Sequence, residues 1–115
     1  MRIEYRAPDS ACNPYITFAV MLAAGLNGIE RNWEPFPPAE TNVCEMSPQE
    51  RATRGILDLP TNLGEAIHLT EGSELVRRAL GDHLFHSFIQ NKKIEWERYC
   101  RAVTDYEIDR YLPIL

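Results

Sequence analysis

Polar and apolar residues alternate at the start of the chain. In an extended segment successive side chains point to opposite sides, so Arg2, Glu4 and Arg6 line one face and the residues between them line an apolar face. This alternation predicts a strand at residues 2–7. It is the only good strand pattern in the sequence, and a single strand cannot pair its own backbone N–H and C=O groups. We therefore expect this strand to join a sheet supplied from outside these residues.

Residues 14–30 are predicted to form a helix with apolar residues on nearly every side. Asn13 is a favoured N-cap residue, and Pro14 suits the first helical position because its missing N–H would have no helical partner there. The helix that follows has large apolar residues on every side rather than along one stripe, in the sequence PYITFAVMLAAGLNGIE. The pattern predicts a buried helix at 14–30 that needs cover all round.

Capping signals divide most of the remaining chain into short helices. Ser47 with Glu50, and Thr104 with Glu107, have the spacing of capping boxes. Three prolines in ten residues exclude a helix between Asn32 and Thr41. We expect a Pro-rich loop at 32–41 and helices at 48–54, 63–70, 74–80, 83–102 and 105–112.

The longest of these helices carries an amphipathic stripe. Large apolar residues recur at intervals of three, four and seven positions, which is the spacing of one helix face. The aromatic residues on this helix are Phe85, Phe88, Trp96 and Tyr99, and Ile89 and Val103 share the apolar spacing. An aromatic stripe of this kind is far more often core packing than a ligand platform, so we expect it to lie in the core. His83 and His86 also lie on this helix, but no third ligand follows at helical spacing, so we expect ordinary imidazoles rather than a zinc site.

The composition argues against two classes of protein, those that bind nucleic acids and those that cross membranes. A chain of 115 residues fits one domain, and a net charge of −5 with scattered basic residues argues against nucleic-acid binding. The longest apolar run is too short to cross a bilayer, so we expect no membrane contact and a cytoplasmic protein. Cys12, Cys44 and Cys100 are odd in number and far apart, and we expect three free thiols, buried or half-buried.

The charged strand face allows two interpretations. A carboxylate between two guanidinium groups can take part in a site for a divalent metal and a phosphate, since Glu4 offers oxygen ligands and Arg2 and Arg6 can grip phosphate oxygens. The same pattern is common on solvated strands, where opposite charges form a weak surface ladder. Spacing alone favours the ladder.

Longer stretches of the sequence resemble a known family. The segment RIEYRAPDSACNPYITFAVMLAAGLNGIE is similar to the part of glutamine synthetase in which a metal-binding strand leads through a turn into a buried helix, and the resemblance continues to the last residues, VTDYEIDRYLPIL. It implies that the chain is mostly α with one N-terminal β-strand, the C-terminal helical portion of the α+β glutamine synthetase catalytic domain. Such a segment would form about the last quarter of that domain.

The resemblance also implies an activity and its residues. Family members use ATP to join ammonia to glutamate through an acyl phosphate. Glu4 matches a carboxylate that binds a divalent ion, Mg or Mn, beside the ATP phosphates. Arg6 matches a catalytic arginine that holds glutamate near its reacting carboxylate, and Arg2 matches one that contacts ATP phosphate. Asp9 and Asn13 match the turn after the strand, where we expect a structural role.

Most of the family's active site lies outside this sequence, so we expect the isolated chain to be inactive. The remainder of a glutamine synthetase chain or subunit would complete the active site. We expect the complete enzyme to form a ring-shaped homo-oligomer. The alternative is a non-catalytic truncated paralogue that binds or regulates full-length glutamine synthetase, and an independent helical binding module is a third possibility. Related ligases use other acids or amines, so the assignment of glutamate as the substrate depends on the resemblance alone. Cys44 replaces a tyrosine that some bacterial members adenylylate, so we expect no such control here.

Overall fold

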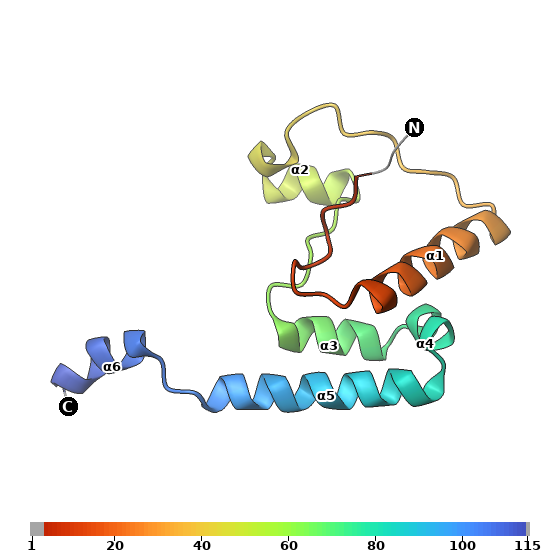
Figure 1. Cartoon of the computed structure of the whole chain (residues 1–115). Coiled ribbons are helices and arrows are strands. Elements are labelled where there is room, and N and C mark those ends of the chain that lie inside the picture. Colours follow the sequence, from red (N-terminus) through yellow and green to blue (C-terminus); the bar gives the residue numbers. More distant parts are fainter. Residues whose placement is uncertain (1–3, 115) are drawn as a thin grey trace. The chain divides into compact units, whose positions relative to one another are not determined.

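The computed structural model describes residues 4–114, which form six α-helices, two short 3-10 helices and no strand. The chain divides into two compact units, unit 1 up to Thr61 and unit 2 from Asn62 onward. The elements are labelled in Figure 1. Unit 1 contains α1 (Pro14–Glu30), η1 (Val43–Glu45) and α2 (Pro48–Thr53), and unit 2 contains α3 (Leu63–Glu71), α4 (Glu74–Leu80), α5 (Asp82–Arg101), α6 (Asp105–Tyr111) and η2 (Leu112–Ile114).

Unit 2 is built around a small apolar core between α3 and α5, which lie side by side (Figure 1). Ile67 of α3 and Phe85 and Ile89 of α5 are buried, each 5–6% exposed. Partly buried neighbours from all three packed helices close round them: Leu63, Val76, Leu80, Phe88 and Trp96. The amphipathic pattern of the long helix therefore places its apolar face against α3 and α4, as a stripe of this spacing requires.

Short polar contacts fix the ends of these helices. Lys93 Nζ donates to Glu71 Oε1 at 2.6 Å and so links α5 to the last turn of α3. At the sharp junction of α4 and α5, Gly81 has a φ of 75°, a region that side chains with a Cβ rarely adopt. Arg77 Nε donates to Asp82 Oδ1 across this junction at 2.6 Å, and this hydrogen bond holds the pKa of the Asp82 carboxyl below its ordinary value.

The C-terminal end of the aromatic stripe lies outside the core, contrary to the prediction. Tyr99 is 66% exposed and Val103 is 72% exposed. The reason is that α3 begins at Leu63, with Gly64 against Trp96, and α5 continues past this point. Tyr99 stacks on Trp96, with ring centroids 5.6 Å apart. Helix α6 follows beyond the end of α5 (Figure 1), and its Thr104–Glu107 capping box is formed.

In unit 1, α1 occupies the residues that the capping signals predict. The Asn13 side chain accepts from the backbone N–H of Tyr15 and Ile16. At the other end Trp33 N–H donates to the Gly28 carbonyl while Asn32 has a φ of 51°, which is the geometry of a Schellman cap with asparagine in the left-handed position. The sequence did not reveal this cap.

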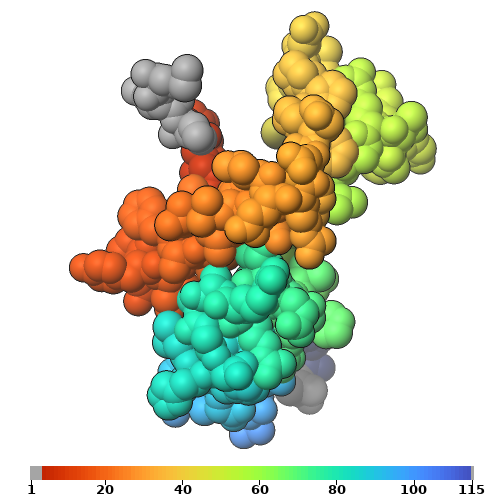
Figure 2. All heavy atoms as spheres, turned by 90° about the vertical axis from the view of Figure 1, so that its right-hand side faces the viewer, coloured from red at the N-terminus to blue at the C-terminus, as the bar shows by residue number. Residues whose placement is uncertain are grey.

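The described residues do not bury α1, so the prediction that this helix is covered all round stays a prediction about parts outside them. None of its residues is buried, and its large apolar side chains stand exposed: Tyr15, Phe18, Met21, Leu22, Leu26 and Ile29. Figure 2 shows side chains of this helix, in orange, protruding without cover on the face in view. The physical reason is that the described residues of unit 1 supply no second layer against which an all-round apolar helix could pack.

The predicted strand is also missing where it can be checked. Residues 4–7 carry no strand, and residues 2 and 3 lie outside the described part of the chain. A strand exists only through its ladder of hydrogen bonds, and no partner strand occurs between residues 4 and 114. The segment therefore has the strand sequence without a sheet to join.

The cysteine prediction is correct in part. Cys12, Cys44 and Cys100 are free thiols, but all three are exposed rather than buried, because each lies on a surface that the described chain leaves uncovered. In the described residues, no helix combines the length and the apolar character that crossing a membrane requires.

Candidate functional site

The charged face predicted at the start of the chain brings Glu4 and Arg6 into direct contact. Arg6 Nε donates to Glu4 Oε1 at 2.6 Å, and Arg6 Nη2 lies 2.5 Å from the same oxygen. The two side chains thus lie on the same side of the segment, as residues two positions apart do in extended chain. Arg2, the third predicted site residue, lies outside the described residues.

This ion pair is open to solvent. The side chain of Arg6 is 87% exposed and that of Glu4 is 57% exposed. An exposed pair of this kind contributes at most about 1 kcal/mol, because water screens the charges and the long side chains lose freedom on pairing. The contact is therefore weak, and it does not lock either side chain.

A compact turn connects this pair to α1. Asp9 Oδ1 accepts from Ala11 N–H at 2.7 Å, and the Asp9 carbonyl accepts from Cys12 N–H at 3.1 Å. Asn13 then caps α1, with its Oδ1 3.0 Å from Tyr15 N. The sequence predicts a structural turn here, and the structure places each of these backbone donors in a defined contact.

The described residues do not form a metal site. Between residues 4 and 114 no three His, Cys, Asp or Glu side chains come together in a way that could hold an ion. Glu4 offers one carboxylate, whereas magnesium needs about six oxygen ligands. Nδ1 of His86 lies 2.6 Å from the Asp82 carbonyl of its own helix. A divalent ion at Glu4 would need ligands from outside the described chain.

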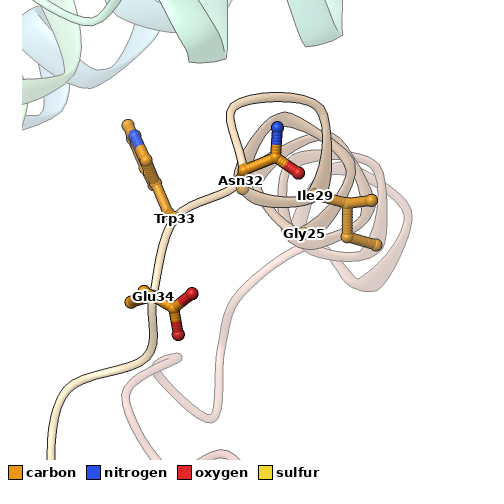
Figure 3. Close-up of a pocket in the computed structure, with 6 residues that line it drawn as sticks. Gly25, Ile29, Asn32, Trp33 and Glu34 are labelled. Carbon is orange, nitrogen blue, oxygen red and sulfur yellow. The ribbon is translucent and has the colours of Figure 1, made fainter.

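A hollow in unit 1 was not predicted from the sequence. It has a volume of about 480 Å³ and lies at the end of α1, where Gly25 and Gly28 leave room beside Trp33. In Figure 3 Ile29 lies on the last turns of the helix, and Trp33 and Glu34 follow on the segment that leaves it. Glycines inside the helix were the available signal. With Glu34 as its one ionisable lining group, the hollow offers no paired acid and base.

A second, smaller hollow of about 250 Å³ lies in unit 2 between α3 and α5. The Trp96 indole covers Gly64 there, and the Glu71–Lys93 ion pair crosses it. These contacts hold two helices together. We assign this hollow to packing rather than to chemistry.

The comparison with known proteins decides the family. The family model described as glutamine synthetase, catalytic domain, matches residues 1–111. The chain belongs to the glutamine synthetase family. The resemblance inferred from the sequence is thereby confirmed.

Curated relatives agree with this assignment. A glutamine synthetase of Mycolicibacterium smegmatis is 52% identical over 113 residues, which are 98% of this chain and 25% of that protein. Another, from Mycobacterium tuberculosis, is 50% identical over the same shares. One from Methanosarcina mazei is 46% identical over 99% of this chain and 26% of that protein. The chain thus spans about a quarter of the length of the glutamine synthetases it matches, and it corresponds to their C-terminal quarter.

Proposed function

We propose that this chain is the C-terminal part of a glutamine synthetase catalytic domain that joins ammonia to glutamate at the expense of ATP. In this proposal Arg6 holds glutamate near its reacting carboxylate, Arg2 contacts ATP phosphate, and Glu4 is one ligand of a divalent ion. The rest of the domain supplies the other groups. The isolated chain is inactive.

One observation carries this proposal: unit 1 holds the groups of a site but none of its walls. Glu4 and Arg6 lie together on a segment that has no strand partner among residues 4–114, and the helix that follows has its apolar side chains exposed. Both features are expected of a piece whose sheet and covering layer lie elsewhere. The quarter-length match to glutamine synthetases supports the same reading.

The proposed roles follow from simple charge chemistry. Transfer of a phosphoryl group to a carboxylate moves negative charge between oxygens, and a guanidinium placed against those oxygens stabilises the charge as it moves. Arg6 suits this task because its planar fork can bind two oxygens at once. When bound, a divalent ion would neutralise phosphate charge, but the described residues alone do not hold one.

The test is reconstitution with a complementary fragment. The 115-residue chain is assayed for phosphate release with ATP, glutamate and ammonia, alone and after co-expression with the first three quarters of the Mycolicibacterium smegmatis enzyme. We expect turnover only in the complex. Turnover by the chain alone would refute its inactivity, and an assembled but inactive complex would refute the catalytic role. Replacing glutamate or ammonia by other acids or amines in the same assay defines the substrates.

Arg6 has a matched control within the chain. Arg101 is also highly exposed, at 81%, and also faces a nearby carboxylate, that of Glu97. We expect Arg6→Ala to lower turnover of the complex by about 100-fold, the size seen when a donor to developing negative charge is removed, and Arg101→Ala to leave it unchanged. Equal effects of the two variants would remove Arg6 from the site.

The alternative role has its own signature. A truncated paralogue that regulates a synthetase would bind the intact enzyme and change its activity, without restoring turnover to the three-quarter fragment. Pull-down with purified intact enzyme and with the fragment, followed by the phosphate assay, separates the two.

A further inference from the structure

The connection between Arg6 and α1 contains one hydrogen-bonded turn, from Asp9 to Cys12. Asp9 uses two acceptors at once: its carboxylate accepts from Ala11 N–H at 2.7 Å and its carbonyl accepts from Cys12 N–H at 3.1 Å. This pairing closes a turn over four residues and is typical of aspartate at the first turn position. The turn leads directly to Asn13, whose side chain caps the helix.

Two prolines stiffen the same connection. Pro8 and Pro14 fix their own φ angles, and each restricts the residue before it to extended backbone. Asn13, which precedes Pro14, has φ −73° and ψ 114°, as this rule requires. Between the prolines, the Asp9 contacts fix the turn that would otherwise be free.

We propose that Asp9 is a positioning residue for the reaction proposed above, on which this inference rests. Its turn sets the direction of residues 4–6 relative to α1, so that docking of α1 into the rest of the domain also brings Glu4 and Arg6 into place. Asp9 itself touches neither substrate nor metal. The link matters because the ion pair of Glu4 and Arg6 is too exposed to hold its own position.

The role needs an acceptor oxygen rather than a charge. The Asp9 side chain accepts one backbone N–H, and the amide oxygen of asparagine can accept the same bond. Asp9→Asn should therefore preserve the turn, whereas Asp9→Ala should lose it. An acid, a base or a metal ligand at this position would not tolerate the asparagine.

The first test measures direction without activity. Residual dipolar couplings of backbone amides are recorded for the full 115-residue chain, comparing residues 4–7 with α1. We expect one shared alignment in the wild type and in Asp9→Asn, and averaged couplings for residues 4–7 in Asp9→Ala. Unchanged couplings in Asp9→Ala would overturn the proposal.

The second test uses the complex with the three-quarter fragment. We expect Asp9→Ala to lower kcat per active site by about tenfold or more, since misplacing reacting groups by about 1 Å costs up to 100-fold. Asp9→Asn should retain wild-type kcat, and so should Ser10→Ala, a control in the same turn. A merely structural role would reduce the amount of assembled enzyme but not kcat per site.

The outcomes separate this inference from the proposed function. An inactive wild-type complex overturns the proposed function and, with it, the role of Asp9 in that reaction. An active wild-type complex with unchanged kcat in Asp9→Ala overturns the positioning role alone. Loss of activity in Asp9→Asn as large as in Asp9→Ala also overturns it, because the charge would then be needed.

Discussion

The two units of this chain differ in what holds them together. Unit 2 buries Ile67, Phe85 and Ile89 between neighbouring helices, whereas the helices of unit 1 have no buried residue. Yet α1 in unit 1 is far more apolar than any helix of unit 2. The unit with the most apolar helix thus buries none of that helix, because burial depends on a second layer and not on the composition of one helix.

This contrast teaches where the chain carries its own stability and where it depends on a partner. Unit 2 brings residues of one face of α5 against α3 and α4, so its apolar burial is internal. In the function proposed above, the exposed apolar surface of unit 1 packs against the rest of a catalytic domain. The contrast can be tested by making the same substitution in both units.

The largest effect is expected from truncating a buried phenylalanine. Phe85 is 5% exposed, and Phe85→Ala should destabilise unit 2 by about 3–5 kcal/mol through lost burial and the cavity left behind. The matched variant Phe18→Ala, at a residue 68% exposed in α1, should change the stability of unit 2 by less than about 0.5 kcal/mol. Urea unfolding followed by Trp96 fluorescence, in a Trp33→Phe background, measures both.

The same pair of variants sharpens the comparison when the complementary fragment is present. In the function proposed above, docking of α1 buries the Phe18 side chain, so Phe18→Ala should then weaken assembly. The fragment concentration needed for half-maximal complex formation measures this. Equal stability of the two variants in the isolated chain would show that unit 2 has no core of its own.

A smaller effect is expected from adding one methyl group to a glycine. A Cβ on Gly64 would lie 2.9 Å from two atoms of the Trp96 indole, so Gly64→Ala must displace that ring or α3 and should cost unit 2 about 1–2 kcal/mol. Nothing lies within 4 Å of a Cβ on Gly25 in α1. Gly25→Ala should instead favour its helix by about 0.5–1 kcal/mol.

Urea unfolding measures the Gly64 variant, and helix content by circular dichroism measures the Gly25 variant. If Gly64→Ala leaves unit 2 as stable as the wild type, the indole moves away freely and the contact does not support the fold.

Local signals explain how much of the fold the sequence predicted. Helix starts depend on contacts within one turn, such as the Asn13 cap and the Ser47 and Thr104 capping boxes, and α1, α2 and α6 begin at the predicted residues. Gly81 with its positive φ likewise divides α4 from α5 where expected. These features require nothing from the rest of the chain.

The sequence predicted less accurately the features that depend on packing layers or strands far away in the chain or outside it. The burial of α1 and the strand at residues 2–7 both need a second layer or sheet, and the described residues contain neither. At the candidate site the alternation of charges correctly placed Glu4 and Arg6 on one side. Glycines in α1 were the one local signal for the hollow beside Trp33, whose lining also includes the cap residue Asn32. Which groups complete the site cannot follow from residues that do not contain them.

The smallest expected effect concerns the capping boxes at the helix starts. It tests whether the capping box of unit 1 is formed as fully as the capping box of unit 2. Glu50 in unit 1 and Glu107 in unit 2 each accept from the backbone N–H and the hydroxyl of a capping residue, and these bonds lower the pKa of each carboxyl below its ordinary value of 4.5. A lowered pKa in the folded state means that the stabilisation is fully present above 4.5 and is lost as the pH falls through the lowered pKa. Carboxyl-carbon NMR titration of the full chain should therefore show both groups titrating below 4.5. Ser47→Ala should raise the pKa of Glu50 part of the way back, because the backbone donor remains, and leave Glu107 unchanged. A Glu50 that titrates at its ordinary value beside a lowered Glu107 would mean that even the local structure of unit 1 depends on a partner.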